Sequence, residues 1–261
     1  MTKPLDRNVL TVWKDVIFAI FIRELQSRFN DKFGLSWLVL EPLLYILLLS
    51  LIRSRISGNE VHGIPIFIFM LYGLLFIRLF TETINSTATS LRKDKPLYAF
   101  RQVQPISSVL AAMLIELMSK IGVFALLLLA IYLIEVDFNL DDGLLMITIF
   151  LTLWIFSAAI GLLFGIGTAF VPELDKVRTL ITRPLFFISG VFFSLQDIPQ
   201  AYWHWLTWNP VLHAIELARF SSYEGYGQAG VSLFYLAIMS LCFTFFALAC
   251  YQLTWKRTLS R

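Results

Sequence analysis

Apolar residues along this chain gather into runs of roughly twenty, the length that a helix needs to cross the hydrocarbon core of a membrane. Short segments rich in charged residues, proline and glycine separate the runs. Because the runs carry so few charges, each of them predicts a transmembrane helix. The predicted spans are residues 35–52, 64–84, 109–134, 144–171, 179–195 and 231–252.

The segment 9–29 has a different pattern, in which apolar and charged positions recur with the period of a helix. The stretch between Asp15 and Arg23 is apolar but too short to span a membrane. We therefore expect an amphipathic helix in the membrane interface, with its basic residues toward anionic headgroups. On this basis residues 1–34 form a cytoplasmic and interfacial N-terminal part, and residues 35–261 form the transmembrane domain. The charged residues assigned to the interfacial helix are Arg23, Glu24 and Arg28.

The segment 196–230 is rich in aromatic residues but is interrupted by Pro199 and by Asn209-Pro210. Asparagine before proline is typical of a helix N-cap with proline at the first helical position, so a short helix over 211–221 is expected. Two half-helices that re-enter the membrane from the outer face fit this pattern, because irregular backbone is tolerated there when protein or a wet cavity surrounds it. A plain interfacial loop is the alternative.

The composition supports a membrane protein, since 58% of the 261 residues are hydrophobic and only 15% are charged. A soluble domain of this length is about half apolar and about a quarter charged. The predicted fold class is therefore an all-α integral membrane protein with six transmembrane helices, an interfacial N-terminal helix and re-entrant outer half-helices between the fifth and sixth spans.

The distribution of lysine and arginine predicts the orientation. Basic residues are concentrated in the N-terminal segment, the loop 85–108, the loop 171–178 and the C-terminal tail, whereas the opposite side holds Arg53, Arg55 and Arg219. The positive-inside rule then places both termini in the cytoplasm.

Motifs for catalysis are absent from the sequence. It contains no GxxxxGK[ST] phosphate loop, HExxH, paired CxxC or GxSxG. We therefore expect no enzyme activity, catalytic residue, metal site or cofactor in this chain, and no nucleic-acid partner.

Charged residues inside the predicted spans are costly and usually face protein or water, and four of them form two closely spaced pairs. Arg78 and Glu82 are four residues apart, as are Glu116 and Lys120, so each pair shares one helical face. A polar cytoplasmic vestibule that admits a charged headgroup or sugar explains them. Mutual pairing near the helix ends is the alternative.

The loop 92–105 combines basic and large apolar residues, which a merely solvated loop does not need. A short helix that docks into another protein explains this combination, because aromatic residues and arginine favour the centres of interfaces. A loop that folds back on the membrane surface is the alternative. The residues assigned to docking are Arg92, Lys95, Pro96, Leu97, Tyr98, Phe100, Arg101 and Pro105.

Gly161 and Gly165 form a small-xxx-small pattern in the fourth predicted span. Such a pattern usually marks close helix packing. A role in gating is the alternative.

Four blocks of the sequence resemble the ABC-2 type permeases, and within them the permeases that export capsular polysaccharide. In chain order, the blocks are Arg23-Glu24-Leu25 to Leu40-Glu41-Pro42, Phe100 to Ile106, Val171 to Ser189, and Ile198-Pro199 through Trp208-Asn209-Pro210 to Ile215-Glu216-Leu217-Ala218-Arg219. Together they cover nearly the whole chain.

This resemblance implies that two copies of the permease pair with two copies of a cytoplasmic ATP-binding subunit, which holds the ATP and magnesium. The loop 92–105 would be the coupling helix, with the N-terminal helix and the loop around Glu173 and Asp175 also contacting that subunit. The segment 196–230 would form the outer gate. A lipid-linked polysaccharide would pass to a periplasmic co-polymerase or adaptor and an outer-membrane exporter, from the bacterial inner membrane.

A sliding glycan needs a wide, wet path, which twelve helices around a two-fold axis can line better than six. Aromatic faces bind sugar rings without fixing their register. The residues assigned to the path and gate are Trp37, Tyr45, Arg78, Glu82, Phe187, Phe192, Phe193, Tyr202, Trp203 and Trp208.

Other functions remain open at this point. An ABC-2 exporter of another glycan (O-antigen or teichoic acid), of a lipid or of a drug shares most of these features. A secondary transporter or a membrane enzyme that works alone would not need the docking loop.

Overall fold

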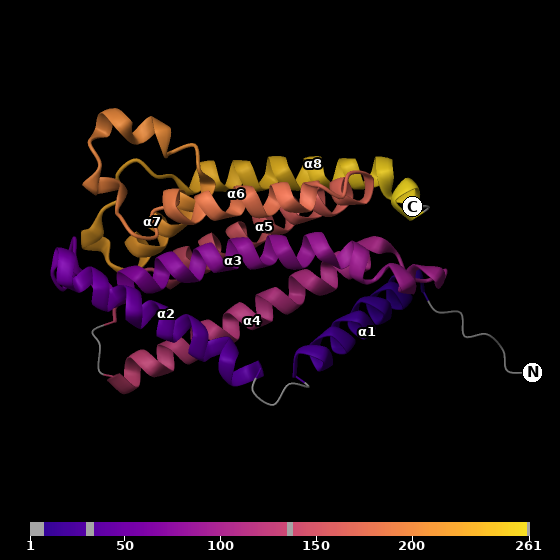
Figure 1. Ribbon diagram of the computed structural model, residues 1–261, viewed down its shortest axis with the longest axis horizontal. Coiled ribbons are helices and arrows are strands. Elements are labelled where there is room, and N and C mark those ends of the chain that lie inside the picture. The colour runs from indigo at the N-terminus through magenta and orange to yellow at the C-terminus, as the bar shows by residue number, and fades with distance from the viewer. Residues whose placement is uncertain (1–7, 30–33, 135–137, 260–261) are drawn as a thin grey trace, which may run out of the picture.

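The computed structural model describes residues 8–29, 34–134 and 138–259. These residues fold into α-helices, four short 3-10 turns and one hairpin of two two-residue strands (Figure 1). The α-helices are α1 (Val9–Phe29), α2 (Gly34–Ser57), α3 (Ile66–Lys93), α4 (Pro105–Ile134), α5 (Gly143–Phe170), α6 (Leu174–Ile188), α7 (Pro210–Ser222) and α8 (Leu233–Leu259). The turns are η1 (Lys95–Ala99), η2 (Leu195–Asp197), η3 (Gln200–Trp205) and η4 (Glu224–Tyr226). The antiparallel hairpin pairs β1 (Glu60–Val61) with β2 (Ile64–Pro65).

The helices α3, α5, α6 and α8 run side by side along the long axis of the molecule, while α1, α2 and α4 cross it obliquely (Figure 1). One end of the molecule carries the start of α1, the η1 connection, the α5–α6 turn and the end of α8 (Figure 1). The opposite end carries α7, the hairpin and the turns that precede and follow α7 (Figure 1). We call these the inner end and the outer end.

Helix α3 forms the centre of the fold. It packs against α2, α4, α5 and α7, and its side chains from Ile68 to Ile77 are buried. The closest approach is to α5, where a Cβ added to Gly161 would lie 1.7 Å from the Thr87 hydroxyl oxygen. Gly165 similarly faces the backbone of Ala88. The packing interpretation of the two glycines is confirmed.

Four of the described helices are long and apolar enough to cross a membrane: α3, α4 over Pro105–Leu133, α5, and α8 over Leu233–Trp255. The helical fold expected from the sequence is therefore confirmed. The count of six crossings stays a prediction, as does the placement of α1 in the interface.

The predicted fifth span, 179–195, is wrong in its boundaries. Helix α6 begins at Leu174 and ends at Ile188, and the chain beyond it turns at Gly190, whose φ is +76°. At 1.5 Å per residue this helix is about 22 Å long, short of the hydrocarbon thickness of about 30 Å. The residues 189–194 that were expected to be helical lie instead in an irregular buried segment.

The loop that carries the predicted docking residues is shorter than the expected loop 85–108. Helix α3 continues to Lys93 rather than ending at 84, and α4 begins at Pro105 rather than at 109. Thr87 and Ser90 in the last turns of α3 donate their hydroxyls to carbonyls of the preceding turn, so these buried polar groups are satisfied within the helix. The connection at the inner end is thus the compact segment 94–104.

At the outer end, the short helix predicted from Asn209-Pro210 is confirmed as α7. The Asn209 side-chain oxygen accepts a hydrogen bond from the Val211 amide at 3.0 Å, and Pro210 is the first helical residue. The predicted first half-helix is not an α-helix, since η2 and η3 are brief 3-10 turns on either side of Pro199.

Candidate functional site

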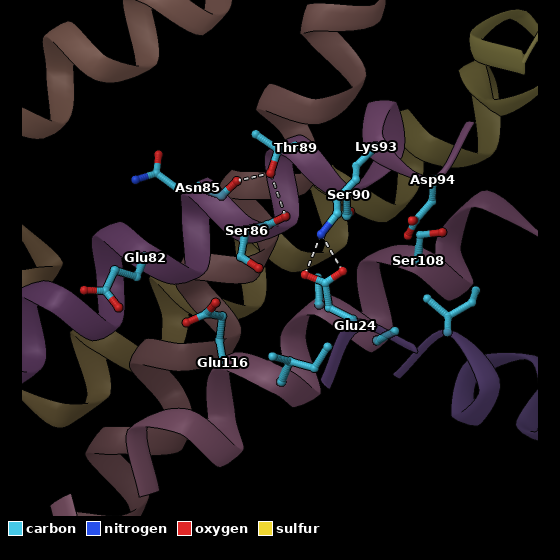
Figure 2. A pocket seen from close by; sticks show the side chains of 14 residues that line it. Glu24, Glu82, Asn85, Ser86, Thr89, Ser90, Lys93, Asp94, Ser108 and Glu116 are labelled. Atoms are coloured by element: carbon cyan, nitrogen blue, oxygen red, sulfur yellow. Dashed lines mark hydrogen bonds and ion pairs between the residues drawn. The ribbon is translucent and has the colours of Figure 1, made fainter. Parts of the chain in front are cut away.

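A cavity of about 370 Å³ lies near the inner end, between α1, α3 and α4, and is lined by both apolar and polar side chains (Figure 2). Its charged lining is mainly acidic, with Glu24, Glu82, Asp94 and Glu116 against Lys93. Side chains with hydroxyl or amide groups complete the polar wall: Asn85, Ser86, Thr89, Ser90 and Ser108. Hydroxyl and amide side chains of this kind can form hydrogen bonds with a hydroxyl-rich group.

Two neighbouring ion pairs join α1 to the junction between α3 and η1. The Lys93 ammonium donates to the Glu24 carboxylate at 2.6 Å, and Figure 2 shows the two side chains facing each other at the cavity. Arg23 pairs with Asp94, whose side chain is only 6% exposed. Because Asp94 also ends α3 and begins η1, helix α1 is fastened directly to the predicted coupling segment.

The four charges predicted inside the spans all have ion-pair partners. Lys120 pairs with Glu82 across α3 and α4 and lies 4.0 Å from Glu116 on its own helix. Arg78 donates to Glu41 of α2 at 2.9 Å and lies 3.9 Å from Glu82. A second cavity of about 120 Å³ adjoins these residues between α2, α3 and α4. The charges thus form a ladder of alternating sign across three helices.

The segment 94–104 presents only part of its predicted docking surface. Phe100 is 65% exposed, and Arg101 is exposed beside it. Leu97 and Tyr98 are half-buried, so Phe100 alone of the three large apolar side chains assigned to docking is exposed. They pack back because η1 is a tight turn, and burial raises the pKa of the Tyr98 hydroxyl. Of the remaining residues assigned to docking, Arg92, Lys95 and Pro96 are exposed and Pro105 is buried.

The second predicted contact with a cytoplasmic partner is the α5–α6 turn, which lies at the same end as η1 (Figure 1). Glu173 is exposed at the N-terminus of α6. Asp175 accepts from Arg178 at 2.7 Å, one turn later on the same helix. Acidic residues in the first turn suit the positive end of the helix dipole.

The residues assigned to a glycan path fall into two groups. Tyr45, Arg78 and Glu82 lie together where α2 meets α3, with the Arg78 guanidinium 5.9 Å from the Tyr45 ring. At the outer end of α6, Phe187 stacks on Phe192 with ring centroids 5.9 Å apart. Phe193 is half-buried in the same irregular segment. The side chain of Trp37, which was also assigned to the path, lies outside the described part of the structure. The same holds for the side chain of Arg28, which was assigned to the interfacial helix.

The aromatic residues of η3 and of the turn that follows it differ in exposure. Trp203 is half-buried, and its indole nitrogen donates to the Ile198 carbonyl at 2.7 Å. Tyr202 and Trp208 are exposed, and the Trp208 indole donates to the Trp205 carbonyl. Trp203 therefore holds the turn together, whereas the other two present aromatic faces at the outer end.

Sequence reasoning missed a buried polar cluster at the outer end. Arg219, which was counted as a loop charge, has 0% exposure and pairs with Glu216 at 2.8 Å. Tyr226 donates to Glu216 at 2.8 Å. The i, i+3 spacing of Glu216 and Arg219 within an otherwise apolar helix was the available signal.

Within the described residues, no group of three His, Cys, Asp or Glu side chains is arranged to hold a metal ion. Among the described residues the structure presents four apolar helices of membrane length, with two cavities between α1, α2, α3 and α4. Several apolar helices of this length are typical of a polytopic membrane protein.

The chain belongs to the ABC-2 type transporter family, whose pattern matches residues 15–223. It is 34% identical to the polysialic acid transport protein KpsM of Escherichia coli over 94% of this chain and 96% of that protein. It is 26% identical to the capsule polysaccharide export inner-membrane protein CtrC of Neisseria meningitidis, over 80% of both chains. It is 23% identical to the capsule polysaccharide export inner-membrane protein BexB of Haemophilus influenzae, over 90% of this chain and 92% of that protein. The family resemblance read from the sequence is confirmed.

Proposed function

We propose that this chain is the permease subunit of an ATP-driven exporter that moves lipid-linked capsular polysaccharide across the bacterial inner membrane. The observation that carries the proposal is the likeness to KpsM along almost the full length of both chains. The likeness to CtrC and BexB, which are named for capsule polysaccharide export at the inner membrane, supports the same cargo class.

The proposed topology has six crossings with both termini in the cytoplasm. Besides the four long apolar helices, α2 supplies 24 helical residues, and α6 supplies a short crossing completed by the irregular segment after it. The inner end then faces the cytoplasm, because the basic residues 92, 93, 95 and 101 cluster there. The re-entrant character of η3 and α7 belongs to this proposal.

The proposed partner at the inner end is an ATP-binding subunit. The chain itself has no phosphate-binding loop, so the energy of ATP must reach it through a contact. The exposed pair Phe100 and Arg101 projects from a segment that ion pairs fasten to α1 and that continues into α3 and α4. A displacement of this segment would be transmitted to α3, the central helix of the bundle.

We further propose that two copies of the chain enclose the path, which delivers the polysaccharide to a periplasmic adaptor and an outer-membrane exporter. Each copy leaves apolar side chains of α2 and α6 exposed, among them Leu48, Leu51, Leu180 and Phe187. The acidic side chains of the cavity between α1, α3 and α4 are engaged in ion pairs with Arg23, Lys93 and Lys120. We therefore place the path along the aromatic residues instead.

The experiment replaces Phe100 by alanine and Arg101 by glutamate in the same chain. We expect surface polysaccharide to be lost while the amount of membrane-inserted permease is unchanged, because the double variant removes only the exposed docking pair. A matched control at the outer end combines Arg55→Glu with Phe234→Ala, both of which are exposed. Normal capsule with the inner variant would contradict the assignment of this segment to coupling.

A further inference from the structure

The segment 189–198 follows α6 as irregular backbone at the outer end, yet much of it is buried. Ser189, Val191, Ser194 and Leu195 have no exposed surface. Buried backbone carbonyls need hydrogen-bond donors, above all where no bulk water is available. The buried carbonyls of this segment therefore need donors from elsewhere in the protein.

Arg219 of α7 supplies them. Its guanidinium donates to the carbonyl of Val191 at 3.2 Å and to the carbonyl of Phe193 at 3.3 Å. It also donates to the carbonyl of Phe69 in α3 at 3.2 Å and lies over the Phe69 ring at 3.4 Å from its centroid. One side chain thus binds the irregular segment and the central helix at the same time.

Glu216 fixes the orientation of this arginine. It accepts from Arg219 at 2.8 Å and is itself held by the hydroxyl of Tyr226. The oxygen of the same tyrosine hydroxyl lies 2.6 Å from the Ser194 hydroxyl, which can donate to it. The Glu216 carboxylate therefore compensates the buried charge of Arg219. Tyr226 of η4 adds a second contact with the irregular segment, through Ser194.

Helix α3 is shaped to accept this contact. A Cβ added to Gly73 would lie 2.9 Å from the Val191 carbonyl oxygen and 3.2 Å from an Arg219 nitrogen. The glycine lets the irregular segment reach the backbone of α3. The main helix contact of α6 is by contrast with α5.

We propose that Arg219 is a positioning residue of export. It clamps the segment 189–198 to α3, so that this segment moves with α3 rather than with α6. The proposal rests on the proposed export function. Because α3 continues from Gly73 to the η1 junction at Asp94, the clamp would link the outer segment to the coupling segment through one continuous helix.

The test uses Arg219→Lys, which keeps the charge but cannot reach three separate carbonyls from one ammonium group. The reporter is Leu195→Cys, which is buried in the intact protein, in a chain whose Cys242 and Cys250 are replaced by alanine. Intact cells are treated with a membrane-impermeant maleimide, and surface polysaccharide is measured in parallel. The matched control is Arg55→Lys, an exposed arginine at the same end.

We expect Arg219→Lys to raise labelling of the reporter on the order of tenfold, equivalent to about 1.4 kcal/mol of lost clamping, and to abolish export. Labelling and export in Arg55→Lys should match the parent. A second reporter, Val109→Cys in the buried inner part of α4, should stay unlabelled in inverted vesicles, which shows that the bundle has not unfolded.

Unchanged labelling in Arg219→Lys would overturn the clamp, and raised labelling with normal export would overturn its role in export. The labelling result does not depend on the cargo. If deletion of the chain left the capsule intact, the proposed function would fail while the clamp itself could still be read from the reporter.

Discussion

At the scale of single residues, Gly161 shows how closely two helices approach in this bundle. Its α-carbon faces Thr87 and the Ile84 carbonyl of α3, and a methyl group there would overlap the Thr87 hydroxyl. Gly122 in α4 is a matched contrast, because a Cβ there meets nothing within 4 Å. The two glycines have similar helical surroundings in sequence but opposite steric surroundings in space.

We predict that Gly161→Ala destabilises the protein by roughly 1–3 kcal/mol, since α3 and α5 must separate to admit the methyl group. For a chain of this size that corresponds to a fall in melting temperature of roughly 2–4 °C per kcal/mol. Gly122→Ala should leave the melting temperature equal or slightly higher, because alanine favours the helix. Thermal unfolding of the detergent-solubilised variants measures both. Equal melting temperatures would contradict the close packing.

Also at this scale, the sequence predicted the residues whose roles are local and missed those whose roles are distant. The Asn209 cap acts on an amide two residues away, so the pattern Asn-Pro was enough. Arg219 acts on carbonyls 26, 28 and 150 residues away in the chain. The spacing from Glu216 to Arg219 indicates a local ion pair, but the neighbouring sequence does not show which distant carbonyls the guanidinium reaches.

At the scale of elements, the link between α1 and the coupling segment depends on Arg23 with Asp94 and on Glu24 with Lys93. The boundaries of α1 were predictable from its helical period, and the structure begins and ends it at the predicted residues. Its partner could not be predicted, because the ion pairs join positions about seventy residues apart.

We predict that Arg23→Glu strongly reduces export, because it places like charges beside the buried Asp94 carboxylate. Combining it with Asp94→Arg should restore much of the export by reversing the pair. Surface polysaccharide, normalised to permease in the membrane, is the measurement. Lys14→Glu, an exposed residue on the same helix, is the control and should export normally. If the double variant were no better than Arg23→Glu alone, the ion pair would not be the link.

The error at α6 belongs to this scale as well. The apolar run 179–195 is long enough for a span, so periodicity and length alone predicted one. The helix ends early because Gly190 adopts a positive φ and because Arg219 replaces the helical hydrogen-bond partners of the carbonyls that follow. That replacement is a tertiary interaction, which a hydrophobicity pattern does not contain.

At the scale of the whole molecule, the two ends of the bundle have different chemistry. The inner end carries Phe100, Arg101 and the tie to α1, and the outer end carries α7 and the exposed aromatic residues Tyr202 and Trp208. The sequence predicted this division, since charge placement and the aromatic segment are both visible in it.

We predict that a single cysteine at position 100 reacts with an impermeant maleimide in inverted inner-membrane vesicles but not in intact, outer-membrane-permeabilised cells. A cysteine at position 202 should show the opposite pattern. Both positions are exposed, at 65% and 59%, so access to the thiol depends on the side of the membrane. Labelling of both cysteines from one side would contradict the proposed topology.

The most direct test of export is to delete the gene in its capsule-forming host and measure polysaccharide at the surface and inside the cell separately. We predict that surface polysaccharide is lost while polysaccharide accumulates inside, and that the wild-type chain restores the surface polymer but the Phe100→Ala, Arg101→Glu variant does not. Unchanged surface polysaccharide after deletion, or loss of the polymer from both compartments, would contradict the account.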